Sequence, residues 1–533
     1  MISTIQVLIL LLAVVTAVAI IANRLKIPPA IPLVITGVLL ALVPGLPPVE
    51  LAPELVLLLV LPPVLYTSAF LMSWREFQFN LRPITLLSVG GVVFTTLAVA
   101  AAAHWLLDLG WPVGFVLGAI ISPPDAIAPL SIARRMVLPR RILVILEGEA
   151  LANDATALIL YRFAVGAVSV GIFSFGHAAA MFAAIVAGEI LWGIGVGWLM
   201  LRLRRWVNDP LIEIMVSLLT PFLAFWPPEH LGGSGVLATV VAGLYVSWNG
   251  PQLISPATRL QGVFFWEFFT YVIEGMVFLI TGLQARTVIS RIGNYPLSQL
   301  AIAVAVITAV VIIARFVWIF PVTYLPRWLF ASIRRKDPAP PWQWPFVLSF
   351  TGVRGIVSLA AALAIPFVTS SGQPFPYRDL ILFLTFSVIL ITLVGQGLML
   401  PWVIRALGLS QAGRKEREMD REQEFNARSA AVKAAIERFD QLATERAFSP
   451  DVIEAVRAQH KDRLKHIRHQ GDGDDAGTHG ELHDDVERSL IAAERAQINE
   501  LFRNGHVKDE ARRRIERELD MREAHLSNQR SEP

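Results

Sequence analysis

Runs of about 20 apolar residues with few charges follow one another through residues 1–406 of this chain. A helix of that length crosses the hydrocarbon core of a bilayer and satisfies its own backbone hydrogen bonds there. Only 17% of the residues are charged, whereas soluble domains carry about 25%. Residues 407–533 are, in contrast, dense in Arg, Lys, Glu and Asp. We therefore predict an all-α polytopic membrane protein, with a transmembrane domain over 1–406 and a charged, helical cytoplasmic tail over 407–533.

The apolar runs divide into thirteen predicted transmembrane spans. The first run lacks the basic n-region of a signal peptide and is long enough to cross the membrane, so we interpret it as a permanent span. The predicted spans are 3–22, 28–46, 52–71, 83–107, 111–133, 142–169, 177–201, 210–227, 232–248, 261–283, 297–325, 344–368 and 379–406.

Basic residues are unevenly distributed over the predicted loops. One set of alternate loops carries 16 Lys and Arg residues, and the other set carries Arg286, Arg291 and Arg378. Because loops rich in Lys and Arg stay in the cytoplasm, this predicts an N-terminus outside the cell inner membrane and a tail inside it. The richer set is Arg24, Lys26, Arg75, Arg82, Arg134, Arg135, Arg140, Arg141, Arg202, Arg204, Arg205, Arg259, Arg327, Arg334, Arg335 and Lys336.

Two of the predicted spans contain helix-breaking sequences near their middle. Residues 122–125 read SPPD and residues 351–355 read TGVRG. Either break alone is best interpreted as an ordinary kink, because Pro and Gly both weaken a helix. Two breaks at corresponding places of two halves, each with an ionisable residue, instead predict inverted repeats whose broken helices cross at a transport site.

Charged side chains inside the predicted spans are costly in lipid and indicate functional sites. Arg315 and Arg354 are the two arginines deep in the spans, and they can neutralise two acids. Asp125 and Arg354 both lie at helix breaks and are predicted to pair, which leaves Glu149 for Arg315. Asp154 is then the acid without a partner charge.

Asp154 is the predicted carrier of the ion and the proton. An unpaired carboxylate in a low-dielectric site can hold one proton or one small cation, but not both. Asn153 offers an amide that orients Asp154 or the ion. Thr156 and the carbonyl group of Ser122 at the helix break would add hard oxygen ligands, which suit Na⁺, Li⁺ or K⁺. Competition for Asp154 gives antiport that requires neither ATP nor a cofactor.

Other charges in the spans have less specific interpretations. Glu267 and Glu274 are seven residues apart on one face of their span and are predicted to face the bundle interior. Arg162 is predicted to reach toward the membrane interface or to cap its helix. Glu189 and Glu213 receive no role.

Five stretches resemble monovalent cation:proton antiporters of the NhaP/NHE type. They are Glu147–Asp154 (EGEALAND), Ser122–Asp125 (SPPD), Gly352–Leu359 (GVRGIVSL), Ala314–Arg315 and Leu61–Pro63 (LPP). The resemblance covers about residues 1–406 and keeps the order of the family's motifs.

This resemblance implies a homodimer in which a mobile core domain carries Na⁺ against H⁺ and serves pH homeostasis. It implies that Asp154 is the carrier, that Asn153 assists it, and that the Asn-Asp form exchanges the ions one for one without net charge movement. Ala150, Pro124 and Ala126 depart from the family pattern, so Li⁺ and K⁺ stay open as alternatives to Na⁺.

Two rival function classes can be weighed from the sequence. Residues 232–235 read GGSG, as in intramembrane serine proteases, but the next histidine after Ser234 is His460 in the tail. We therefore interpret this stretch as a loop or a helix start and predict no enzyme. A cation channel remains the second alternative. A channel needs no titratable carrier, so the paired and unpaired charges in the spans favour a carrier. No nucleic-acid partner is expected.

Overall fold

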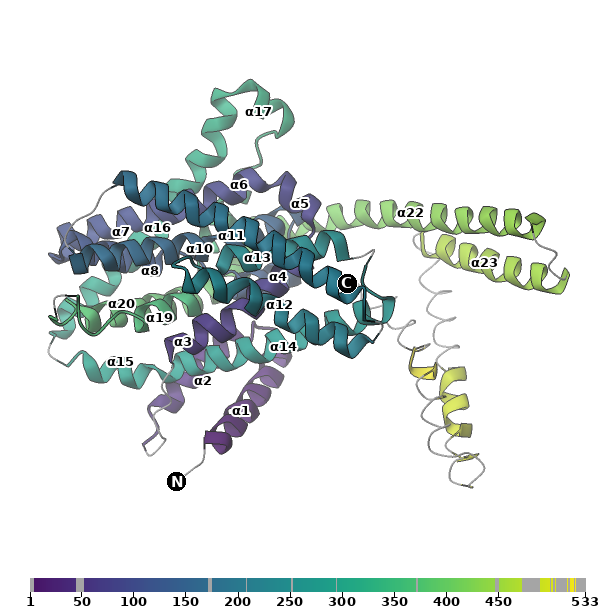
Figure 1. Ribbon diagram of the computed structural model, residues 1–533, viewed down its shortest axis with the longest axis horizontal. Coiled ribbons are helices and arrows are strands. Elements are labelled where there is room, and N and C mark those ends of the chain that lie inside the picture. The colour runs from purple at the N-terminus through teal and green to yellow at the C-terminus, as the bar shows by residue number, and fades with distance from the viewer. Residues whose placement is uncertain are drawn as a thin grey trace. The chain divides into compact units, whose positions relative to one another are not determined.

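The computed structural model is helical over nearly all of the chain that it describes (Figure 1). It describes residues 4–44, 52–170, 175–207, 209–250, 253–293, 295–370, 372–445, 450–471 and 489–498, together with 500, 501, 504, 515, 518–521 and 523. Within these ranges the one β-type pairing is an isolated bridge between Val368 and Pro374.

Eight helical segments of the described residues are long and apolar enough to cross a membrane. They are α1 (Thr4–Leu25), α3–η1–α4 (Pro53–Leu55, Val56–Val60, Leu61–Leu71), α6–η2–α7 (Leu81–Thr85, Leu86–Gly91, Val92–Leu107), α11 (Phe175–Arg204), α12 (Pro210–His230), α14 with α15 (Pro256–Leu283, Ala285–Arg291), α16 (Leu297–Leu329) and α20–η4–α21 (Arg378–Leu390, Ile391–Gln396, Gly397–Ala406).

The remaining helices of this region are shorter or more polar. Helix α10 (Arg140–Val170) has 31 residues and carries the acids of the EGEALAND stretch. The shorter ones are α2 (Ala30–Ala41), α5 (Trp74–Phe79), α8 (Trp111–Ile121), α9 (Ile127–Arg135), α13 (Val236–Asn249), α17 (Ala331–Lys336), α18 (Gln343–Phe350) and α19 (Ile356–Leu363). Each predicted span overlaps helical structure, while the count of thirteen crossings stays a prediction.

Both predicted helix breaks are present, and they meet. Helix α8 ends at Ile121 and α9 begins at Ile127, whereas α18 ends at Phe350 and α19 begins at Ile356. The backbone N–H of Asp125 in the first break donates a 2.7 Å hydrogen bond to the carbonyl of Val353 in the second. Four helix ends therefore converge on one place inside the bundle.

Segment η2 shows how a local irregularity fixes a neighbouring helix. Residues 86–91 form a π-helix inside the α6–α7 rod, and such a bulge leaves carbonyl groups available to other donors. The indole Nε1 of Trp318 on α16 donates to the Leu86 carbonyl at 2.9 Å. This contact ties α16, which carries Arg315, to the same rod.

Helices α2 and α14 approach each other closely through glycine. A Cβ atom built on Gly37 would overlap the backbone of α14, and one built on Gly282 would overlap the backbone of α2. Only a residue without a side chain allows this packing. The close contact fixes α14, whose acids are discussed below.

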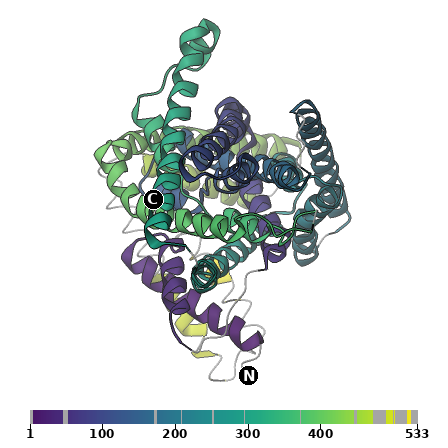
Figure 2. The same ribbon diagram turned by 90° about the vertical axis from the view of Figure 1, so that its left-hand side faces the viewer.

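The chain divides into two compact units, Met1–Arg414 and Lys415–Pro533. The first unit extends past residue 406, because Leu409 is only 3% exposed and belongs to an apolar cluster with Leu138, Ile142 and Val403. The division into a transmembrane domain over 1–406 and a cytoplasmic tail stays a prediction. The second unit contains most of α22 (Leu409–Glu445) and all of α23 (Pro450–Gly471). Within the first unit, α17 and the end of α16 project from the other helices (Figure 2).

Candidate functional site

Asp125 lies at the start of two half-helices at once. Its Oδ1 atom accepts a 2.9 Å hydrogen bond from the backbone N–H of Ile127 on α9, and its carboxylate also accepts from the N–H of Ile356 on α19. Helix N-termini carry partial positive charge and free N–H groups, so they stabilise an anion. A Cβ atom on Gly355 would overlap this carboxylate, which explains the glycine there.

Two arginines lie at the opposite, C-terminal ends of the half-helices. Arg354 is 1% exposed, and its Nε donates to the carbonyl of Ile121, the last residue of α8, at 2.6 Å. Arg315 Nε donates to the carbonyl of Leu348 near the end of α18 at 3.0 Å. A cation at a helix C-terminus satisfies carbonyl groups that have no partner inside the helix. The four half-helix ends are thus compensated by charges of the appropriate sign.

The predicted ion pair between Glu149 and Arg315 is present. Arg315 Nη1 and Nη2 donate to the two carboxylate oxygens of Glu149 at 2.5 and 2.8 Å. The side chains are 2% and 8% exposed. This two-point geometry is the strongest arrangement available to a guanidinium and a carboxylate, and burial makes the loss of either partner costly.

The predicted ion pair between Asp125 and Arg354 is not formed among the described residues, and that prediction is wrong. Both side chains bind backbone groups at half-helix ends instead. Arg354 lies beside Arg315, and both guanidinium groups border Gly352. A Cβ atom built on this glycine would be 3.0 Å from Arg315 Nε and 3.1 Å from Arg354 Nη1. Glu149 therefore compensates a site that contains two guanidinium groups. Charge matching along the sequence overlooked helix termini as partners.

An acidic cavity of about 470 Å³ opens beside the crossing. Its walls come from η1, α4, α9, α10, α14 and α19. Five acids line it: Asp125, Glu147, Asp154, Glu267 and Glu274. Both acids of α14 thus line the cavity, as the prediction for their span requires for Glu274, whereas Glu267 is exposed.

One basic residue, Arg134, lines the described part of this cavity, and it already pairs with Glu147 at 2.7 Å. Asp125 accepts hydrogen bonds from the two helix N-termini described above. Asp154 is half-buried and has no ion pair or hydrogen bond with any residue that the structure describes. The cavity therefore carries excess negative charge, with Asp154 as an unpaired carboxylate on its wall.

The other predicted ion ligands do not gather around Asp154. Asn153 is fully buried, and its Nδ2 donates to the carbonyl of Pro124 at 2.6 Å, so it joins α10 to the first helix break. Thr156 lines a separate, mainly apolar cavity of about 840 Å³. Ser122 lines a small cavity beside Glu149. Of the predicted set, only Asp154 lines the acidic cavity.

Sequence reasoning missed several hydroxyl groups on the cavity wall. These are Thr67, Ser68, Ser131, Thr270, Tyr271 and Ser358. They are hard oxygen ligands of the kind that alkali cations prefer. Thr67 and Ser68 lie four and five residues after the LPP stretch, so their polarity within an apolar run was a signal that could have identified them.

Two further charges are explained by the fold. Arg162 forms an ion pair with Glu229, and its predicted place at the membrane interface or as a cap stays a prediction. Glu189 is 3% exposed and accepts hydrogen bonds from the backbone N–H groups of Ser234 (2.6 Å), Gly235 (3.1 Å) and Leu237 (3.1 Å). The GGSG stretch is thus the loop before α13, as predicted, and Glu189 caps that helix.

The family model for the transmembrane region of sodium/hydrogen exchangers matches residues 9–406. The chain belongs to this family. It is 34% identical over 529 residues to a Na⁺/H⁺ exchanger of Mycobacterium tuberculosis named as uncharacterized, which covers 98% of this chain and 96% of that protein. It is also 34% identical over 412 residues to the sodium, potassium, lithium and rubidium/H⁺ antiporter of Bacillus subtilis, covering 74% of this exchanger and 60% of that protein.

The fold of this exchanger also resembles a solved structure. The sodium proton antiporter MjNhaP1 from Methanocaldococcus jannaschii, determined at pH 8, superposes with a TM-score of 0.60 at 20% identity, covering 76% of this chain and 98% of that one. The protein is therefore a multi-pass membrane transporter of the Na⁺/H⁺ exchanger family with a helical antiporter fold.

Proposed function

We propose that this exchanger is a secondary active antiporter that moves one Na⁺ against one H⁺ across the cytoplasmic membrane, with Asp154 as the group that both ions occupy in turn. The observation that carries the proposal is the unpaired Asp154 carboxylate on the wall of an acidic cavity. Because one carboxylate cannot hold both ions, release of either must precede binding of the other. Exchange at a single site then moves no net charge.

The surrounding charges suit this mechanism. Acidic groups around a cavity raise the local concentration of cations, and five acids against one already paired arginine give the cavity that character. Glu149, Arg315 and Arg354 neutralise one another or bind helix ends, so they stabilise the crossing without occupying the cavity. Alternating access would move the crossing helices relative to α4 and α14, which form the facing wall.

Orientation and assembly belong to the same proposal. Arg134 at the end of α9 and Glu147 in the first third of α10 line the cavity. They flank the loop that the distribution of basic residues assigns to the cytoplasmic side. We infer that the cavity opens to the cytoplasm, that the N-terminus lies outside, and that thirteen spans with inverted repeats cross the membrane. The protein is proposed to act as a homodimer.

K⁺/H⁺ exchange by the same mechanism is the second candidate. The Bacillus subtilis relative is named for sodium, potassium, lithium and rubidium. The hydroxyl groups of the cavity wall are oxygen donors that any alkali cation accepts. The cavity is also larger than one dehydrated alkali cation requires, so its size alone selects none of them.

Reconstituted protein in liposomes tests the proposal. Vesicles loaded at acidic pH contain a pH dye, and Na⁺, Li⁺ or K⁺ is added outside with and without an imposed membrane potential. The proposal predicts that the interior becomes more alkaline with wild type, independently of the potential, and that Asp154→Asn abolishes the response. Cation flux driven by the potential in both proteins, without proton movement, would identify a channel and refute antiport.

A further inference from the structure

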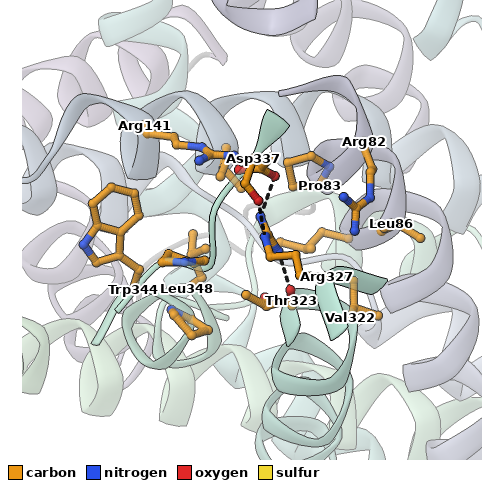
Figure 3. Close-up of a pocket in the computed structure, with 14 residues that line it drawn as sticks. Arg82, Pro83, Leu86, Arg141, Val322, Thr323, Arg327, Asp337, Trp344 and Leu348 are labelled. Atoms are coloured by element: carbon orange, nitrogen blue, oxygen red, sulfur yellow. Dashed lines mark hydrogen bonds and ion pairs between the residues drawn. The ribbon is translucent and has the colours of Figure 1, made fainter. Parts of the chain in front are cut away.

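A second charged pocket lies apart from the acidic cavity, where the ends of three helices of the bundle meet (Figure 3). It has a volume of about 40 Å³. Arg82 on α6, Arg141 at the start of α10 and Arg327 near the end of α16 line it, and Asp337, which directly follows α17, completes the charged groups. We call it the Arg82 pocket.

Asp337 neutralises only part of this charge. Its Oδ1 accepts from Arg141 Nη2 at 2.8 Å, and its Oδ2 accepts from Arg327 Nη2 at 2.6 Å. Figure 3 shows the carboxylate between these two guanidinium groups, with Arg82 beside them. Arg327 is 7% exposed, and its Nε also donates to the Asp337 carbonyl at 3.1 Å. Three guanidinium groups and one carboxylate leave two uncompensated positive charges.

Arg82 is the group that lacks a counterpart. It is half-buried and lines the pocket, yet it makes no hydrogen bond or ion pair with any part of the chain that the structure describes. Like charges held close together in a partly buried site repel each other strongly. An anion inside the pocket would remove this repulsion, and Arg82 would then have a partner.

The shape of the pocket restricts that anion to a small one. A volume of 40 Å³ holds about three water molecules, which is the size of a tetrahedral oxyanion. Pro83, Pro340 and Pro345 form part of the wall, and their fixed φ angles limit the freedom of the backbone there. The planar fork of arginine binds the oxygen atoms of phosphate in pairs.

We propose that the Arg82 pocket binds a phosphate group, supplied either by the headgroup of an anionic phospholipid or by free phosphate. Trp328 and Phe330 beside the pocket's Arg327 are 75% and 56% exposed, as aromatic side chains at a membrane interface are. A bound phosphate would hold the ends of α6, α10 and α16 together. Helices α10 and α16 carry Asp154 and Arg315, so the occupied pocket would stiffen the helices that hold the ion site.

Thermal unfolding of the full-length protein in detergent tests this proposal through its tryptophan fluorescence. Wild type, Arg82→Gln and Arg334→Gln are titrated with sodium phosphate against sodium chloride at equal ionic strength. They are also titrated with dioctanoyl phosphatidic acid against dioctanoyl phosphatidylcholine. Arg334 is an exposed residue of α17 outside the pocket, so its variant removes the same charge without touching the site.

We expect a saturable rise of the unfolding midpoint in wild type and in Arg334→Gln. Arg82→Gln should need at least about tenfold more probe to reach half of this rise, because it loses a charged hydrogen-bond donor to the phosphate. A response to both phosphate-bearing anions supports the shared chemistry, a response to phosphatidic acid alone assigns the source to lipid, and a response to inorganic phosphate alone assigns it to the free ion. No saturable response in wild type, or equal responses in the three proteins, would overturn the proposal. Arg82→Lys keeps the charge but not the fork, and it should bind more weakly than wild type.

Discussion

Replacing Glu149 by Gln tests whether this carboxylate compensates two buried arginines. The variant keeps the size of the side chain and removes its charge, which leaves Arg315 and Arg354 at 8% and 1% exposure without an anion beside them. Removing one partner of a buried ion pair typically costs about 3–5 kcal/mol of unfolding free energy. We expect the upper part of that range, because two guanidinium groups lose their counter-charge together.

The prediction is measured by unfolding in one detergent, with heat and with denaturant, for wild type and three variants. Glu76→Gln is the matched control, because Glu76 pairs with Arg140 while 35% and 50% of their side chains are exposed. An exposed pair contributes about 0–1 kcal/mol, so this control should unfold nearly as wild type does. The double variant Glu149→Met with Arg315→Met should recover part of the loss, since a buried pair can be replaced by apolar residues at little cost, while Arg354 still lacks an anion.

The opposite ordering would refute the reasoning. If Glu149→Gln unfolded at the same midpoint and with the same yield as Glu76→Gln, the buried guanidinium groups would not depend on Glu149. If the double variant were less stable than Glu149→Gln alone, Arg315 would contribute mainly through its contact with the end of α18 rather than through the ion pair.

Three further substitutions have distinct expected outcomes. Gly355→Ala should lower the free energy of unfolding by several kcal/mol, because its Cβ atom would overlap the Asp125 carboxylate. A lower yield of monodisperse protein from size-exclusion chromatography would show this loss. Glu274→Gln should raise the cation concentration needed for half-maximal exchange by a few-fold with little change in yield, because it removes one acid from the cavity. Glu54→Gln is the exposed control. Equal half-maximal concentrations for both variants and wild type would contradict this expectation. Asn153→Ala should destabilise the protein by about 1–3 kcal/mol, because it leaves a buried carbonyl of the helix break without its donor, and the shift of the unfolding midpoint tests it.

Much of the scaffold follows from the sequence because lipid constrains it so strongly. Hydropathy places the helices, and Pro and Gly place the breaks at 122–126 and 351–355. Charge inventory identifies the pair of Glu149 and Arg315, since few counter-charges are available inside the spans.

The details of the site depend on directions in space that periodicity does not supply. Asp125 and Arg354 are compensated by half-helix ends, which have no signature of charge in the sequence. Thr156 is only two residues from Asp154, yet it faces a different cavity, because neighbouring positions on a helix point in different directions. The acids of α14 line the acidic cavity only because the fold brings that helix to the same cavity as α10.

Proton release on cation binding tests the central claim most directly. Purified protein in weakly buffered detergent solution is mixed with NaCl, and the pH change is compared with that after choline chloride. If Na⁺ and H⁺ compete for Asp154, wild type releases up to one proton per bound Na⁺, the release vanishes in Asp154→Asn, and Glu54→Gln behaves as wild type. Undiminished proton release from Asp154→Asn would show that another group exchanges the ions and would contradict the account.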